Sequence, residues 1–95
     1  MPEKLTPDQV RERLEQLSGW ELSDNSIVKS YQFENYYQTM AFVNSVAWVA
    51  HQMNHHPNLE VGYNRCVVWY STHDAGGVTE IDLQAASRVE ALGGL

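Results

Sequence analysis

One long helix, from about Tyr36 to Asn54, is the element that most restricts how this chain can fold. Four apolar side chains recur there at the spacing of one buried helical face: Phe42, Val46, Val49 and Met53. Pro57 bars further helix, and it biases His56 away from the helical region of backbone conformation. The chain has 95 residues, which is the size of a single domain, so we expect residues 1–95 to form one domain.

A second helix is expected near the start of the sequence. Thr6 is followed by Pro7, and Gln9 stands three residues after Thr6, which is typical of a helix start with a capping box. We expect this helix to cover about residues 7–18, because Gly19 is placed to end it.

A third helix is expected near the end of the sequence. Thr79 with Asp82 three residues later is again a capping pair, and this role alone is enough to account for Asp82. The helix should continue to about Leu92, where Gly93 and Gly94 close it.

Two β-hairpins are expected between the helices. Residues 20–22 and 27–33 are β-rich runs around the turn residues 23–26, and residues 59–63 and 66–73 are strand-like runs joined at Asn64-Arg65. Side chains alternate between the two faces of a strand. In the last run, Val67, Trp69, Ser71 and His73 therefore share one face, and Val68, Tyr70 and Thr72 share the other.

The element order is therefore α-β-β-α-β-β-α, which predicts an α+β fold. Two hairpins separated by a long helix indicate a four-stranded, mainly antiparallel sheet with three helices packed on one face. The other face would carry polar and aromatic side chains. The sheet edges are candidates for self-association, because an unpaired edge strand invites another chain.

Composition excludes several classes of function. Six Lys and Arg residues against twelve Asp and Glu residues give a net charge of −6, and the basic residues are scattered, so direct binding of nucleic acid is not expected. One cysteine, Cys66, excludes an intramolecular disulfide and a Cys-rich zinc module. No apolar run reaches the length of about 18 residues needed to span a membrane. We expect a protein of the reducing cytoplasm.

All four histidines lie between positions 51 and 73. His51 and His55 are four residues apart near the end of the long helix, so they lie on one helical face. His56 should point elsewhere because the helix stops, and His73 reaches the others only through the fold. Histidine exchanges protons near neutral pH and also binds metals, so the cluster suits acid–base chemistry or a metal site.

Several alternatives to a catalytic role remain for these residues. Gln52 stands where the metalloprotease pattern H-E-x-x-H has Glu, so we expect no metal. His51 taken alone is a surface histidine, and Cys66 is a small apolar filler within a strand. The three tryptophans are expected in the core or at an interface: Trp20, Trp48 and Trp69.

The stretch from His51 to Asp82 resembles the signature of the pterin-4a-carbinolamine dehydratase family. In that signature an acidic or basic residue precedes His-His-Pro, and an aromatic residue, a His and an Asp follow at set spacings. This chain has His51, residues 55–57 as His-His-Pro, then Tyr63, His73 and Asp82. Further similar stretches are Gly19-Trp20, Tyr63-Asn64 and Ser71 to Gly77, so that the resemblance covers about residues 5–92.

The resemblance implies the same α+β fold and a homodimer or homotetramer. The implied activity is loss of water from 4a-hydroxytetrahydropterin to give quinonoid dihydropterin, without metal or cofactor, which recycles the tetrahydropterin cofactor. The implied catalytic residues are His55, His56 and His73. The implied pterin-binding residues are Trp20, Asn54, Pro57, Ser71, Thr72, Asp74 and Asp82.

Two other functions fit the same sequence. Some members of the family act as dimerisation partners of a transcription factor, so the chain would then be a non-catalytic, coactivator-type binding protein. In the second alternative, the chain would be a pterin-binding protein of molybdopterin-related metabolism. Which histidine acts as acid and which as base stays open at this point.

Overall fold

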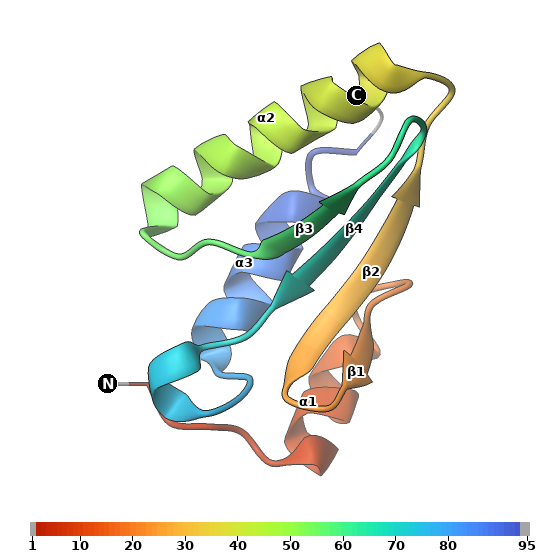
Figure 1. Cartoon of the computed structure of the whole chain (residues 1–95). Helices are drawn as coiled ribbons and strands as arrows, with labels where there is room; N and C mark the ends of the chain where they lie inside the picture. The colour runs from red at the N-terminus through yellow and green to blue at the C-terminus, as the bar shows by residue number, and fades with distance from the viewer. Residues whose placement is uncertain (1, 94–95) are drawn as a thin grey trace.

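The structure, a computed structural model, describes residues 2–93 and has the predicted order of elements (Figure 1). The elements are α1 (Pro7–Leu14), β1 (Glu21–Ser23), β2 (Ser26–Gln32), α2 (Tyr36–Met53), β3 (Asn58–Val61), β4 (Arg65–Tyr70), the single 3-10 turn η1 (His73–Ala75) and α3 (Glu80–Glu90). The α+β fold class is thereby confirmed.

The four strands form one antiparallel sheet in the order β1-β2-β4-β3. Ile27 pairs with Tyr70, and Leu59 pairs with Val68, so the inward side chains of neighbouring strands stand in register. The helices cover this inner face, and the opposite face stays open (Figure 1). The three-helix layer on one face of the sheet is as predicted.

The core lies between the inner face of the sheet and α2 and α3. Phe42, Val46 and Val49 of α2 are buried as predicted, whereas Met53 at the end of the helix is half-buried. The inner face of the sheet contributes residues that are 0% exposed: Ile27, Cys66, Val68 and Tyr70. Burial raises the pKa of the Cys66 thiol, which fits the apolar filler expected from the sequence.

The first helix is shorter than predicted. It ends at Leu14 rather than near Ser18, because the amides of Glu15, Gln16 and Leu17 bond to carbonyls three residues back, the pattern of tight turns. Gly19 then takes a φ of +85°, which a side chain would disfavour.

The other boundaries differ by a few residues. The second hairpin pairs Asn58–Val61 with Arg65–Tyr70, because the Gly62 amide bonds to the Arg65 carbonyl and closes the turn early. At its other end β4 stops at Tyr70, and His73 lies beyond it in η1. The last helix ends at Glu90, two residues before Leu92, and the predicted stop at Gly94 lies outside the described residues.

A part-buried carboxylate ties α3 to the first hairpin. Glu90 accepts hydrogen bonds from the Trp20 indole at 3.2 Å, the Lys29 ammonium at 2.9 Å and the Tyr31 hydroxyl at 2.7 Å. Burial opposes ionisation of Glu90, but these three donors hold its pKa below the ordinary value. Burial and the Glu90 carboxylate in turn raise the pKa of Tyr31.

We expect Glu90→Gln to lower the free energy of unfolding by about 1 kcal/mol or more at pH 7, because three donors lose a charged acceptor. A depressed carboxylate pKa stabilises the fold above the unfolded value of about 4.3, and this contribution is lost as pH falls through the folded value. Urea unfolding from pH 7 to pH 3 should therefore show the variant and the wild type converging in acid.

Glu12→Gln is the matched control, because Glu12 is an exposed residue of α1. It should leave the stability unchanged at pH 7. A gap between wild type and Glu90→Gln that stays constant down to pH 3 would contradict the role of the ionised carboxylate.

Candidate active site

The end of α2 sends two consecutive histidines to different sides of the molecule. Asn54 caps the helix in the left-handed conformation, with φ 50° and ψ 43°, which asparagine tolerates better than most residues. The His55 amide still bonds to the Ala50 carbonyl at 3.0 Å, which closes the helix. His55 then turns toward the inner face of the sheet, whereas His56 is exposed.

His55 is held on two sides by buried groups. Its Nε2 lies 2.5 Å from Oδ1 of Asp82, and its ring stacks on Tyr70 with 5.5 Å between centroids and 24° between planes. The His55 side chain is 16% exposed, whereas the Asp82 side chain is 0% exposed. Burial raises the pKa of Tyr70 to about 12, and the nearby Asp82 charge adds to the effect.

Asp82 also starts α3, as the capping pattern predicted. Its Oδ2 accepts from the Thr79 amide at 2.8 Å, and the Thr79 side chain caps the same helix. The same Oδ2 accepts from the Thr72 hydroxyl at 2.8 Å. One carboxylate therefore joins the start of α3 to the end of α2 and to the segment that follows β4.

Two recesses adjoin His56. The first has a volume of about 390 Å³, and its lining includes His51, Asn54, His55, His56 and Pro57. The second has a volume of about 250 Å³ and is lined by His56, Asn58, Trp69, Ser71 and His73. His56 belongs to both, so all four histidines line the two recesses: His51 and His55 line the first, His73 lines the second, and His56 lines both.

The alternation along β4 explains which residues meet in the second recess. Trp69, Ser71 and His73 were predicted on one face, and all three line this recess. Thr72 was predicted on the other face, and its hydroxyl bonds inward to Asp82. His73 itself lies in η1 rather than in the strand, so a single 3-10 turn and not the strand presents its imidazole.

The remaining candidate residues lie in different places. Asp74 is exposed in η1, next to His73. Trp20 lines neither recess: it is 4% exposed, packs edge-on against Tyr31 at 6.4 Å between ring centroids, and donates to Glu90. The structure therefore does not bring Trp20 together with the histidines, although Trp20 was expected to bind pterin.

Three residues around the histidines were missed from the sequence. Asn58 and Trp69 line the second recess, and Trp69 could have been found because it alternates with Ser71 and His73. Tyr70 was placed on the inner face, but its stacking on His55 depends on a contact between segments far apart in sequence.

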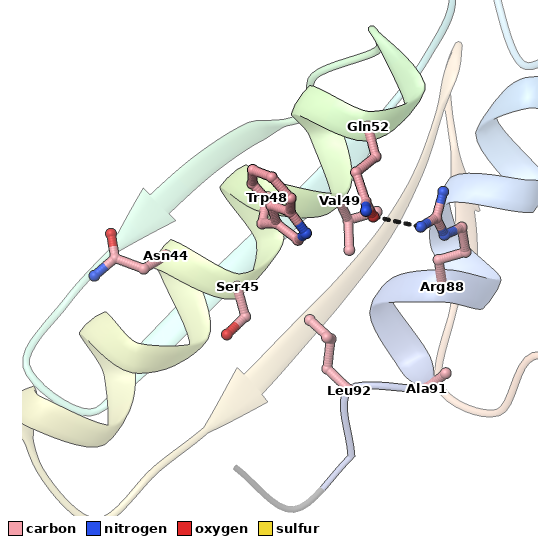
Figure 2. Close-up of a pocket in the computed structure, with 8 residues that line it drawn as sticks. All are labelled: Asn44, Ser45, Trp48, Val49, Gln52, Arg88, Ala91 and Leu92. Carbon is pink, nitrogen blue, oxygen red and sulfur yellow. Dashed lines mark hydrogen bonds between the residues drawn. The ribbon is translucent and has the colours of Figure 1, made fainter.

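A separate groove lies between α2 and α3 (Figure 2). It has a volume of about 550 Å³, and the Trp48 indole, 60% exposed, stands on its α2 side. The Arg88 guanidinium of α3 donates to the Gln52 side chain of α2 at 2.6 Å across one end. None of the residues that line this groove lines either histidine recess.

Among residues 2–93, no helix is both long enough and apolar enough to cross a membrane. Within the same residues, no three side chains of the His, Cys, Asp and Glu types are grouped so as to hold a metal ion.

Comparison with known proteins identifies the family. The model of the family described as pterin 4 alpha carbinolamine dehydratase matches residues 3–92. The chain belongs to this family. A relative from Nitrosomonas eutropha, assigned as a pterin-4-alpha-carbinolamine dehydratase, is 52% identical over 89 residues, covering 93% of this chain and 79% of that protein. A relative from Bdellovibrio bacteriovorus with the same assignment is 49% identical over 94 residues, covering 95% and 78%.

Two solved structures share the dehydratase fold. The Brucella melitensis protein described as a transcriptional coactivator/pterin dehydratase has a TM-score of 0.91 and 33% identity, covering 97% of this chain and all of that one. A pterin dehydratase-like protein described as a RuBisCO assembly factor of the alpha-carboxysome has a TM-score of 0.65 and 25% identity, covering 79% and 87%. Pterin dehydratase chemistry and assembly roles are thus both described among proteins of this fold.

We expect Tyr70→Phe to stabilise this dehydratase fold. The Tyr70 hydroxyl is buried and has no hydrogen-bond partner within residues 2–93, a situation that costs about 1–3 kcal/mol. Phenylalanine keeps the ring that stacks on His55 and removes the hydroxyl. The melting temperature should rise by about 4 °C or more, measured by circular dichroism. Tyr63→Phe, at an exposed tyrosine, is the control, and a lower melting temperature for Tyr70→Phe would contradict the expectation.

Proposed function

We propose that this chain is a pterin-4a-carbinolamine dehydratase, a hydro-lyase that converts 4a-hydroxytetrahydropterin to quinonoid dihydropterin and water. The observation that carries the proposal is the position of His56, which lines both recesses and so brings His55 and His73 to adjoining surfaces. The family match over residues 3–92 supports the activity, and it also supports treating the whole chain as one functional domain.

The reaction needs two proton transfers, which histidines perform near neutral pH. The bond from C4a to the hydroxyl oxygen breaks, and that oxygen must gain a proton because hydroxide is a poor leaving group. A ring nitrogen of the pterin loses a proton as the new double bond to C4a forms. One imidazolium and one neutral imidazole therefore suffice, each contributing about 10²–10⁴-fold, and neither metal nor cofactor is needed.

The pterin would be held by the residues around these imidazoles. Ser71 and Asn58 supply polar atoms to the second recess, whose Trp69 offers an aromatic surface to a flat ring. Asn54 and Pro57 line the first recess, and Asp74 stands exposed beside His73. Thr72, Asp82 and Trp20 would instead act indirectly, because the Thr72 hydroxyl is directed inward, Asp82 is fully buried and Trp20 belongs to the Glu90 cluster.

We expect His73→Ala to lower turnover more than tenfold, because one of the proton-transferring imidazoles is lost. The exposed position of His73 means that the fold should be unaffected. The assay follows formation of quinonoid dihydropterin from freshly generated 4a-hydroxytetrahydropterin by ultraviolet absorbance, in buffer treated with a chelator.

Gln84→Ala is the control, because Gln84 is exposed on α3 and lines neither histidine recess. Wild-type turnover by a folded His73→Ala variant would remove His73 from the mechanism.

The same assay tests the function itself. If the unmodified protein gives a rate equal to the uncatalysed rate, the dehydratase proposal is wrong, and pterin binding would then separate the two alternative functions. A coactivator-type partner protein should bind no reduced pterin, whereas a molybdopterin-related protein should bind pterin but discriminate against the 4a-carbinolamine.

We also propose that the chain assembles into a homodimer or homotetramer through α2. This helix of 18 residues contains no Asp, Glu, Lys or Arg, although the whole chain has a net charge of −6. Its exposed residues include a stripe at alternating spacings of four and three, the pattern of helices that pack together: Tyr37, Ala41, Asn44, Trp48 and His51. Tyr37 is 82% exposed, and Trp48 borders the groove of Figure 2. An uncharged, aromatic surface of this kind is unusual on a monomer.

Trp48→Lys should shift the protein to a smaller assembly, because it places a charge in the centre of this stripe. Light scattering coupled to size-exclusion chromatography measures the mass directly, and wild type should elute as a dimer or tetramer. Gln84→Lys adds the same charge at an exposed position of α3 and should leave the mass unchanged. A monomeric wild type, or a Trp48→Lys variant with the wild-type mass, would contradict assembly through α2.

The remaining expectations concern surroundings and partners. A free, buried Cys66 suits a reducing compartment, so we place the reaction in the cytoplasm. The small-molecule pterin is the proposed ligand. Scattered basic residues in a chain of net charge −6 argue against direct contact with nucleic acid.

A further inference from the structure

The hydrogen bonds at Oδ2 of Asp82 fix which groups around this oxygen donate. The backbone amide of Thr79 can only donate, so Oδ2 of Asp82 is an acceptor. Thr72 gives its one hydroxyl hydrogen to the same Oδ2. The Thr79 hydroxyl, 2.7 Å from the Thr72 hydroxyl, must therefore donate to Thr72. Both hydrogen bonds to the protein backbone and to Thr72 use Oδ2, which leaves Oδ1 to His55.

The same reasoning applies to the other oxygen of the carboxylate. With Asp82 as a carboxylate, Oδ1 can only accept, so Nε2 of His55, 2.5 Å away, carries a hydrogen whether the imidazole is neutral or protonated. The lone pair of the neutral ring is therefore on Nδ1. Stacking on Tyr70 restricts rotation of the ring, and the His55 side chain, 16% exposed, lines the recess shared with His56.

We propose that Asp82 is a positioning residue that holds His55 as the Nε2–H tautomer and so makes Nδ1 the nitrogen that accepts a proton. The inference rests on the proposed dehydratase function, and it assigns the base that the sequence left open. When Nδ1 takes the proton from the pterin ring nitrogen, the imidazolium that forms lies against the buried carboxylate, which stabilises it. His56 and His73, which are both exposed residues and line the second recess, are left to protonate the departing hydroxyl.

Thr72 and Thr79 extend this role. The Thr72 hydroxyl and the Thr79 amide both donate to the second oxygen of Asp82, and the Thr79 hydroxyl supports the Thr72 hydroxyl, so the carboxylate is fixed in rotation and presents one oxygen to His55. Thr72 lies between Ser71 and His73, so the backbone that carries residues of the second recess is attached to the same carboxylate. Asp82 thereby fixes the His55 ring of the first recess in position relative to Ser71 and His73 of the second.

The variant Asp82→Asn tests the tautomer directly. The Thr79 amide requires an acceptor, so the oxygen of the introduced amide must take the place of Oδ2, and its NH₂ group must face His55. Nε2 can then only accept, which forces the neutral imidazole to carry its hydrogen on Nδ1. The helix cap and the packing are retained, whereas the reactive nitrogen is changed. An equivalent exchange in the serine protease triad lowers turnover by about 10⁴-fold through the wrong tautomer.

The experiment combines nuclear magnetic resonance with kinetics. Protein labelled with ¹⁵N at histidine reports for each ring which nitrogen carries the hydrogen. The wild-type His55 ring should be protonated at Nε2 and the Asp82→Asn ring at Nδ1. Turnover of the variant should fall about 100-fold or more, with KM changed less than about threefold. Asp8→Asn, at an exposed aspartate in the first turn of α1, should alter neither measurement.

Each result decides a separate point. A wild-type His55 ring protonated at Nδ1 overturns the positioning role, whatever the activity and whether or not the variant folds. The role is also overturned if the wild type is active and the Asp82→Asn variant, with its His55 hydrogen moved to Nδ1, keeps full turnover. A wild-type rate equal to the uncatalysed rate overturns the proposed function, while the spectra still decide the tautomer.

A second variant, Thr72→Val, removes one donor to Oδ2 of Asp82. It should lower turnover less than Asp82→Asn does, and His55 should keep its hydrogen on Nε2. An effect on turnover as large as that of Asp82→Asn contradicts the proposal.

Discussion

The buried carboxylate of Asp82 is the interaction on which the arrangement of the site depends. A carboxylate without exposure to water is tolerated only when hydrogen-bond partners surround it, and here the partners come from three separate segments. The start of α3, the residues after β4 and the residue after the α2 cap must meet at one point for the carboxylate to be satisfied. The position of His55 is therefore coupled to the correct packing of α2, α3 and the sheet.

Backbone geometry at the ends of β4 and α2 directs one histidine inward and two histidines outward. Beyond β4, Thr72 turns inward to Asp82 while Ser71 and His73 line the recess with Trp69 and Asn58. The left-handed cap at Asn54 has the same effect on the other side, because His55 goes inward and the next residue outward. The result is one enclosed imidazole backed by a carboxylate and two more exposed ones. This asymmetry is what an acid–base pair needs, since the two partners must differ in protonation state.

The two sides of α2 belong to two different surfaces of the molecule. One side supplies Phe42, Val46 and Val49 to the core, and the opposite side carries exposed tyrosines and Trp48. An uncharged helix face with exposed aromatic side chains is suited to contact with a second copy of a chain whose net charge is −6, because no like charges meet there. His51 lies in the last turn of the same helix and His55 follows its cap, so the proposed assembly surface and the candidate site share one structural element.

The sequence by itself determined the features that depend on neighbouring residues: the element order, the capping pairs Thr6–Gln9 and Thr79–Asp82, the buried face of α2 and the alternation that brings Ser71 and His73 together. It misjudged the ends of α1 and β4 by several residues, because helix and strand ends are set by competing turns. Only the tertiary structure decided that Asp82 faces His55 across 27 residues of chain and that Trp20 packs with Glu90 instead of the histidines. Periodicity and capping act within a few residues, whereas these contacts depend on how the helices pack across the sheet.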